Sequence, residues 1–340
     1  MSLHERSFGW LRSQVLELYR QQDYARARDL VEEALPFFPE HWPTLVLWRA
    51  ILTLRLGSPE EALAILEEAI GQGLWFGPAQ LEDEDLAPLR SLPAFAALEK
   101  ICQERYAEAQ TSSHPGILVL EPDNLVPPPY PTLFVLHGNQ SSPLAELEYW
   151  QPITAHRWQV ALPCSSQLVG YGLASWNDEA RAMDEICTHW ERQQRWKRID
   201  PQHVVLAGFS RGARIALRLA LEGRIPAIGF IAICPTLEAS QTLLPQDTCQ
   251  VRLGFVLLGE HDQCAPTTLA AIERLRAAGL TCEVKLIPAW VSTPPTFSEE
   301  LPAFLAHFVQ LHSSRRISTV AGRSWWKLAG NGDHDALICY

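Results

Sequence analysis

The stretch His-Val-Val-Leu-Ala-Gly-Phe-Ser-Arg-Gly over 203–212 decides the fold of this chain, because it joins a strand, a sharp turn and a helix. Its apolar half is typical of a buried strand, and the helix-forming run 213–220 follows directly. Gly208 and Gly212 flank Ser210 at positions where a side chain would collide with neighbouring backbone in a strained turn. A serine on such a turn presents its hydroxyl, so the segment nominates Ser210 as a nucleophile.

Composition limits the classes of protein to which the chain can belong. Its 340 residues leave room for two domains, and 47% hydrophobic and 20% charged residues are ordinary values for a soluble globular protein. The net charge of −11 argues against general nucleic-acid binding, and no apolar run approaches the roughly 20 residues of a membrane span. Residues 1–6 lack the apolar run of a secretory signal. We therefore expect a cytoplasmic protein without nucleic-acid partners or membrane spans.

The eight cysteines are scattered along the chain and include no C-x-x-C pair. Most of them stand in apolar strand or helix contexts, which favours reduced, buried thiols. The pattern therefore predicts neither a disulfide framework nor a metal site, and we expect no cofactor.

The first hundred residues carry a helical pattern that repeats. Segment 27–35 aligns with segment 62–70 at an offset of 35 residues, and a turn precedes each copy. This pattern resembles tetratricopeptide repeats, whose period is about 34 residues. A further helix over 93–110 is expected to complete the stack. This part is either a surface that binds a protein partner or a helical cap on the domain that follows.

Near 111–116 the helical pattern gives way to short apolar runs separated by helical stretches. The expected strands are 117–120, 133–136, 160–162, 204–206, 228–233, 253–258 and 283–287. The expected helices are 177–195, 212–222, 267–278 and 297–312. Such alternation predicts a mostly parallel sheet covered by helices on both faces.

The link between the first two strands, 127–131, is proline-rich and too short for a crossover helix, so these strands are expected to run antiparallel. The whole pattern predicts a helical domain over 1–112, an α/β domain over 113–314 and a C-terminal tail over 315–340.

Three motifs of the second domain stand in a characteristic order: Leu-Phe-Val-Leu-His-Gly-Asn over 133–139, the Ser210 turn, and Gly-Glu-His-Asp over 259–262. This order resembles the α/β-hydrolase superfamily, in which a G-x-S-x-G turn is the nucleophile elbow of a serine hydrolase. Three phrases more narrowly resemble the carboxylesterase/phospholipase and dienelactone-hydrolase branch. They are Val-Ala-Leu-Pro-Cys-Ser-Ser-Gln over 160–167, Ala-Gly-Phe-Ser-Arg-Gly-Ala over 207–213 and Gly-Phe-Ile-Ala-Ile-Cys-Pro over 229–235.

The resemblance spans about 115–312 and implies roles for several residues. Ser210 would be the acyl-accepting nucleophile. The backbone N–H of Arg211 and that of Asn139, or of Gln140 beside it, would form the oxyanion hole. Asp262 follows an expected strand, where the acid of the triad belongs, although it also suits a helix cap.

Trp176 fits a Trp-Asp segment that lies near the pocket in the resembling hydrolases. It is a candidate wall of the substrate pocket, with core packing as the alternative.

The base of the triad is absent from its expected place. In such hydrolases a Gly-His pair follows the last strand, whereas Val291-Ser292 stands there in this chain, and no histidine lies between positions 262 and 306. The remaining candidate is His334 in the tail, which is otherwise a loosely held extension. Without a base, Ser210 is a poor nucleophile.

Two functions therefore stay open. In the first, the chain is a serine hydrolase of the carboxylesterase type that cleaves a small-molecule ester or thioester through Ser210. In the second, it is a non-catalytic hydrolase-fold protein, a pseudoenzyme that binds a small acyl ligand and, through its helical repeats, a protein. The complete turn around Ser210 favours the first function, and the Val291-Ser292 loop favours the second.

Overall fold

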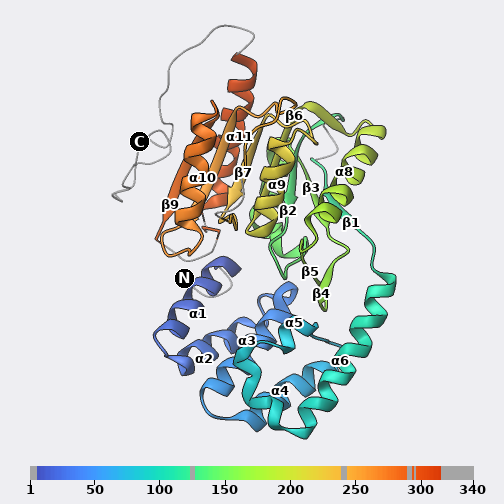
Figure 1. Cartoon of the computed structure of the whole chain (residues 1–340), viewed down its shortest axis with the longest axis vertical. Helices are drawn as coiled ribbons and strands as arrows, with labels where there is room; N and C mark the ends of the chain where they lie inside the picture. The colour runs from blue at the N-terminus through green and yellow to red at the C-terminus, as the bar shows by residue number, and fades with distance from the viewer. Residues whose placement is uncertain (1–5, 123–126, 239–242, 289–292, 295, 315–340) are drawn as a thin grey trace.

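Two kinds of architecture follow one another along the chain, with helices up to residue 112 and alternating strands and helices after it (Figure 1). The structure, a computed structural model, describes residues 6–122, 127–238, 243–288, 293–294 and 296–314. Val291, Ser292 and His334 lie outside the described residues.

The N-terminal part is a stack of helices in which α1 packs on α2, α2 on α3 and α3 on α4. Its helices are α1 (Phe8–Arg20), α2 (Tyr24–Ala34), α3 (Trp42–Arg55), α4 (Pro59–Gly71), α5 (Pro78–Leu81) and α6 (Pro93–Ser112), with 3₁₀ turns η2 (Pro39–His41) and η3 (Glu84–Ser91). Ala27 of α2 and Ala62 of α4 are fully buried, as expected where helices approach closely. The resemblance to tetratricopeptide repeats stays a prediction.

Local capping sets where these helices begin. The Ser7 hydroxyl accepts a hydrogen bond from the N–H of Trp10 at 3.1 Å, and the Asp23 carboxylate accepts one from Arg26 at 3.3 Å. Pro59 is the first residue of α4, where the missing N–H of proline costs no helical hydrogen bond. These starts follow from residue types that the sequence shows directly.

The second part is a seven-stranded sheet with the strand order β1-β3-β2-β6-β7-β8-β9. The strands are β1 (Gly116–Leu120), β2 (Tyr130–Leu136), β3 (Gln159–Cys164), β6 (Ile199–Phe209), β7 (Gly229–Ile233), β8 (Leu253–Gly259) and β9 (Thr281–Ile287). Every neighbouring pair is parallel except β1 with β3, so the predicted mostly parallel sheet is confirmed.

The first two strands run antiparallel as expected, but they are not neighbours, because β3 lies between them. The burial of the strands explains this order. β1 is only half-buried along its whole length, whereas β2 and β3 are almost entirely buried. The half-buried strand takes the edge, and the two apolar strands take positions covered on both faces.

Helices cover both faces of the sheet (Figure 1). They include α8 (Glu179–Arg195), α9 (Arg211–Leu221), α10 (Ala265–Ala277) and α11 (Phe297–Ser314), which confirms the four expected helices. Alternate residues of β6 face opposite sides: Leu206 packs with α8, α9 and α10, whereas Val205 and Ala207 pack with α11. None of the helices in the described ranges is long and apolar enough to cross a membrane.

The pairing of β6 with its neighbours places the site. Gly208 lies beside Leu136 of β2, and Phe209 lies beside Ile233 of β7. The segments that leave the carboxyl ends of these strands therefore meet at one edge of the sheet, which is where open α/β sheets place their ligands.

Candidate active site

Ser210 occupies the turn between β6 and α9 that the sequence predicts. Its φ of 53° and ψ of −118° are an unusual backbone conformation for a residue with a side chain. The N–H of Ser210 donates to the carbonyl oxygen of Ile233 at 2.8 Å, and its own carbonyl oxygen accepts from the N–H of Arg214 at 3.2 Å. Hydrogen bonds on both sides hold the serine in this strained position.

The two glycines of the motif allow α9 to approach the sheet. A Cβ at Gly208 would lie 2.7 Å from the carbonyl carbon of Gly212 and 2.8 Å from the carbonyl oxygen of Leu136. A Cβ at Gly212 would collide with the carbonyl oxygens of Leu136 and His137. These are backbone atoms that cannot rotate away, so the elbow requires glycine at both positions.

Of Asn139 and Arg211, which are predicted to form the oxyanion hole, only Asn139 is among the residues that line the cavity beside Ser210. Asn139 lines this cavity, and Gln140 beside it has a φ of 52°. Arg211 is the first residue of α9, so its N–H has no partner within the helix. The N–H of Gly138 donates to Glu146 Oε1 at 3.4 Å. The N–H groups of Gly138 and of Ser141, which donates to the carbonyl oxygen of Ala174 at 3.2 Å, are therefore already used, and Asn139 and Gln140 stay the candidates in this loop.

His137 and Trp176 form a brace beneath this loop. Their rings stack 4.5 Å apart, and Trp176 Nε1 donates to the carbonyl oxygen of His137 at 2.8 Å. Burial lowers the pKa of His137 to about 4, and its Nδ1 lies 2.8 Å from the carbonyl oxygen of Gly138. Trp176 is itself fully buried and lies outside the lining of the cavity. Its indole supports the loop from behind.

Asp262 follows β8, where the sequence places it, and its two carboxylate oxygens differ in their contacts. Its Oδ1 accepts the N–H of Cys264 at 2.8 Å, which closes the turn that leads into α10. Its Oδ2 is buried and has no hydrogen-bond partner among the described residues. Burial raises the pKa of this carboxyl group. An N–H donor would satisfy the second oxygen, which is the bond that the acid of a triad makes with its base.

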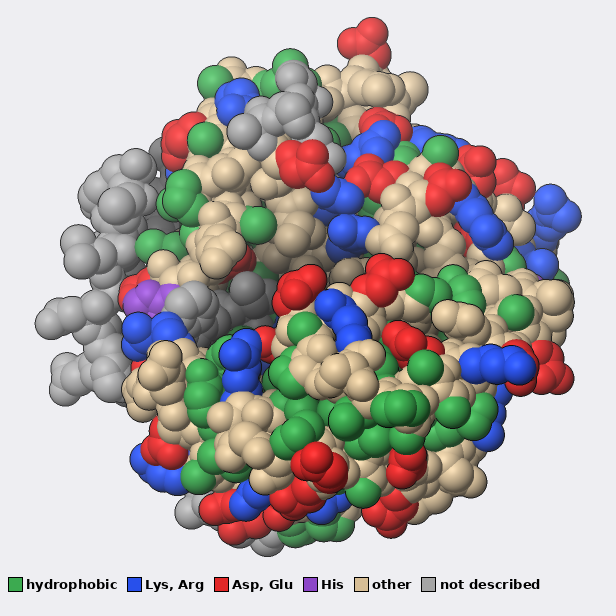
Figure 2. Space-filling model, turned by 60° about the horizontal axis from the view of Figure 1, so that its bottom comes forward, with side chains coloured by type: hydrophobic (Ala, Val, Ile, Leu, Met, Phe, Trp, Pro, Cys, Tyr) green, Lys and Arg blue, Asp and Glu red, His purple; other side chains and the backbone are tan. Residues whose placement is uncertain are grey.

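A cavity of about 400 Å³ lies beside Ser210, between the N-terminal helices and the sheet. Figure 2 shows the surface hollowed along the seam between these two parts of the chain. The helical wall includes Phe8, Gly9, Arg12, His41, Thr44 and Trp48. The sheet-side wall includes Gly138, Asn139, Glu146, Tyr149, Phe209 and Ser210.

The first turn of α1 is bonded to the sheet part. The N–H of Phe8 donates to Glu148 Oε1 at 3.1 Å, and the N–H of Gly9 donates to the Tyr149 hydroxyl at 2.8 Å. A carboxylate at a helix N-terminus is favoured by the unsatisfied N–H groups there. These bonds fix α1 as part of the cavity wall.

Glu146 is the buried carboxyl group of this wall. It accepts hydrogen bonds from the N–H of Gly138 and from Trp150 Nε1, both at 3.4 Å. Burial raises its pKa to about 7, which these hydrogen bonds oppose. Near neutral pH the group is therefore divided between its neutral and charged forms.

His41, which no sequence motif indicates, is the histidine that lines the cavity within the described residues. Burial and the neighbouring Arg12 lower its pKa to about 3, so the imidazole is neutral at physiological pH. His41 and Arg12 lie far from Ser210 in the sequence and belong to no motif. Their position depends on how the N-terminal helices pack, which a local pattern does not reveal.

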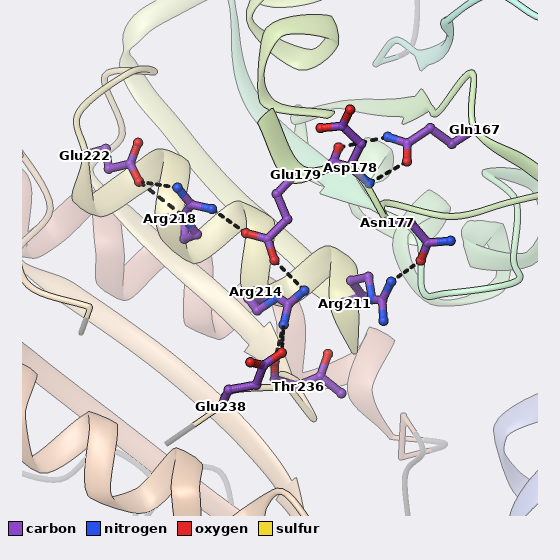
Figure 3. Close-up of polar contacts among 10 residues, drawn as sticks. All are labelled: Gln167, Asn177, Asp178, Glu179, Arg211, Arg214, Arg218, Glu222, Thr236 and Glu238. Atoms are coloured by element: carbon purple, nitrogen blue, oxygen red, sulfur yellow. Dashed lines mark hydrogen bonds and ion pairs between the residues drawn. The ribbon is translucent and has the colours of Figure 1, made fainter. Parts of the chain in front are cut away.

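Behind Ser210, Arg214 and Arg218 of α9 form an ionic network, and Arg211 of the same helix makes a separate contact (Figure 3). Glu179, the first residue of α8, forms ion pairs with both Arg214 and Arg218. Arg214 also pairs with Glu238 at 3.2 Å, although its side chain is only 7% exposed. The Arg211 guanidinium donates to the side chain of Asn177. The network ties α8 to the helix that begins at the nucleophile.

The comparisons with known proteins concern the helical part and the fold. The family described as "A/B hydrolase-like, N-terminal domain" matches residues 8–110, which is less than a third of the chain. No curated protein matches the chain. No finding shows tetratricopeptide repeats.

Among solved structures, the chain is similar to an uncharacterized protein from Bacillus cereus ATCC 10987, at 24% identity and a TM-score of 0.49 over 90% of this chain and 100% of that one. It is similar to the Bacillus cereus carboxylesterase at 15% identity and a TM-score of 0.45, over 59% of this chain and 98% of that one. It is also similar to S-formylglutathione hydrolase from Staphylococcus aureus at 14% identity and a TM-score of 0.45, over 58% of this chain and 100% of that one.

The mostly parallel sheet with helices on both faces has the architecture of an α/β-hydrolase fold, and the family match over residues 8–110 agrees with it.

Proposed function

We propose that this chain is a serine hydrolase of the carboxylesterase type, in which Ser210 attacks a carboxylic ester or thioester. The observation that carries the proposal is the conformation of Ser210, which is strained between β6 and α9 and opens onto a cavity of about 400 Å³. A turn with only a structural purpose needs no strained serine beside a cavity, whereas a nucleophile elbow does.

In the proposed reaction, Ser210 Oγ forms a bond to the acyl carbon, and its proton passes to a base. The N–H groups of Arg211 and of Asn139 or Gln140 stabilise the oxyanion. The base returns the proton to the departing alcohol or thiol, and water then releases the acid from Ser210. Asp262 orients the base through the Oδ2 that has no partner among the described residues.

The proposed base is His334, which belongs to the tail outside the described residues. His41 is disfavoured for this role although it lines the cavity, because the imidazolium that it would become stands close to the charge of Arg12. The proposal includes three parts of the chain: a helical domain over 1–112, a hydrolase domain over 113–314 and a C-terminal tail over 315–340.

The second candidate is a non-catalytic protein with the same cavity, favoured by Val291-Ser292 where Gly-His is expected. Its helical part would bind a protein. Figure 2 shows hydrophobic side chains gathered on the forward face of the N-terminal helices, and exposed Phe37 and Leu56 belong to this part of the chain.

A fluorophosphonate probe, which labels activated serines, tests the two candidates against each other. We expect labelling of the full chain that is lost in Ser210→Ala and in His334→Ala but kept in Ser112→Ala, which changes an exposed serine at the end of α6. Absence of labelling at high protein concentration contradicts the hydrolase proposal. In that case Ser292→His restores the expected loop, and new labelling would identify a hydrolase scaffold that lacks only its base.

A further inference from the structure

Arg12 of α1 places a guanidinium in the cavity beside the nucleophile. Its side chain is half-buried and lines the cavity, and Cζ lies 5.5 Å from the ring centroid of Phe209, the residue before Ser210. The bonds that hold the first turn of α1 lie only one helical turn away from Arg12. Its position is therefore set by the same contacts that build the cavity wall.

The surroundings of Arg12 provide little compensation for its charge. Within the described part of the chain, Arg12 takes part in no ion pair. Burial lowers the pKa of the guanidinium, and the neighbouring Glu146 opposes this only in part. Both oxygens of Glu146 already accept hydrogen bonds, from Gly138 and Trp150. Cys234 and Tyr149 also oppose the shift, and the neighbouring imidazole of His41 is neutral.

Arg214 shows how this chain treats a guanidinium that has only a structural role. It is buried behind the elbow and pairs with two carboxylates, Glu179 and Glu238. A buried charge is normally paired in this way, because an unpaired one loses its hydration without replacement. Arg12 is half-buried, forms no ion pair among the described residues and lines a cavity instead.

We propose that Arg12 binds a carboxylate of the ligand, so that the cavity takes a small ester or thioester with a free carboxylate, such as a dicarboxylic half-ester. This inference names the substrate class of the proposed hydrolase and rests on that function for the position of the ester at Ser210. The carboxylate would accept two parallel N–H bonds from the planar guanidinium.

Charge and size favour a singly charged carboxylate over a phosphate. A single guanidinium balances one negative charge, and Glu146 and Glu148 lie beside the cavity in a chain of net charge −11. A volume of about 400 Å³ suits a small ligand rather than a long acyl chain.

Isothermal titration of the full chain with monomethyl glutarate and dimethyl glutarate tests this proposal. The two compounds share one skeleton and differ in a single free carboxylate. We expect the Ser210→Ala variant, which cannot consume an ester, to bind the monomethyl compound at least about tenfold more tightly. Arg12→Met should abolish this preference, and Arg12→Lys should keep part of it. Arg20→Met, which removes an exposed arginine from the same helix, should leave it unchanged.

Equal binding of the two compounds, or an unchanged preference in Arg12→Met, overturns the proposal. Tighter binding of inorganic phosphate than of monomethyl glutarate also overturns it, because the site would then take a different anion. If Arg12→Met does not fold, Arg12→Lys and Arg12→Gln give the comparison, since lysine keeps the charge and glutamine loses it.

The design separates this proposal from the proposed hydrolase activity. A carboxylate preference without fluorophosphonate labelling leaves the Arg12 site in place and contradicts the hydrolase. Labelling of Ser210 without a carboxylate preference supports the hydrolase and contradicts the proposed role of Arg12.

Discussion

The two walls of the cavity differ in how they are encoded. On the sheet side, a run of neighbouring residues places Ser210, its glycines and the donors around it, and strand pairing brings the Asn139 loop alongside. On the helical side, Arg12 and His41 come from separate elements that no motif connects. The proposed reaction therefore depends on local backbone geometry, whereas the proposed choice of ligand depends on how α1 and η2 dock.

Gly212→Ala tests the sheet-side wall and should have the largest effect on stability. The new methyl group would meet the carbonyl oxygens of Leu136 and His137, so either α9 or β2 must move. We expect the free energy of unfolding to fall by about 3 kcal/mol or more, as is usual for overpacking against rigid atoms. Urea unfolding followed by circular dichroism measures this change.

Gly71→Ala is the matched control for that substitution. Gly71 is the last residue of α4, and a Cβ there would meet no atom within 4 Å. The change should be neutral or stabilise the chain by up to about 1 kcal/mol, because alanine favours a helix. Equal effects of the two substitutions would mean that the elbow does not depend on close approach of α9.

The sequence predicts the sheet-side wall well because this wall depends on local backbone geometry, which is also why we expect Gly212→Ala to lower stability. Continuous apolar runs and glycine spacing are local signals. The seven strands and the Ser210 turn therefore lie close to the positions that the sequence predicts. The antiparallel direction of β1 also follows from a short link, but its neighbour does not, because pairing depends on how fully each strand is buried.

The helical wall could be predicted as helices but not as part of the site. The repeat at an offset of 35 residues indicates packed helices, yet it gives no signal for which side chains face the sheet. In the sequence, Arg12 is one polar residue of an amphipathic helix. Only the bonds of Glu148 and Tyr149 to the first turn of α1 place it at the site. Trp176 is the opposite case. Its sequence context makes it a candidate wall of the pocket, but its side chain is buried behind the His137 loop.

Glu146→Gln tests the boundary between the walls and should have an intermediate effect that depends on pH. The pKa of Glu146 is about 7 in the folded chain, above its ordinary value of 4.5. The folded state therefore binds the extra proton, and this contribution to stability is complete below pH 4.5 and lost as the pH rises through 7. We expect wild type to lose about 2 kcal/mol relative to Glu146→Gln between pH 5 and pH 8.

Urea unfolding of both proteins across this pH range measures the difference. Glu67→Gln, at an exposed position of α4, controls for the loss of one negative charge. Parallel curves for wild type and Glu146→Gln would contradict the raised pKa of the buried Glu146 carboxyl group.

Tyr149→Phe should have the smallest effect and separates the walls most directly. It removes the hydroxyl that accepts the N–H of Gly9, which leaves a buried donor without that partner and should cost about 1 kcal/mol. Because the hydroxyl bonds to Gly9 and Ser7 at the start of α1, the amides of α1 should exchange hydrogen faster while those of β6 keep their protection. Tyr106→Phe, within α6, is the control.

The consequence for ligand binding follows from the same bond. Loosening α1 displaces Arg12 but leaves the elbow conformation of Ser210 unchanged, since the hydrogen bonds of that turn come from Ile233 and Arg214. Tyr149→Phe should therefore weaken the preference for a free carboxylate and keep fluorophosphonate labelling. If labelling falls together with the preference, the two walls act as one unit, and the nucleophile itself depends on the docked helix.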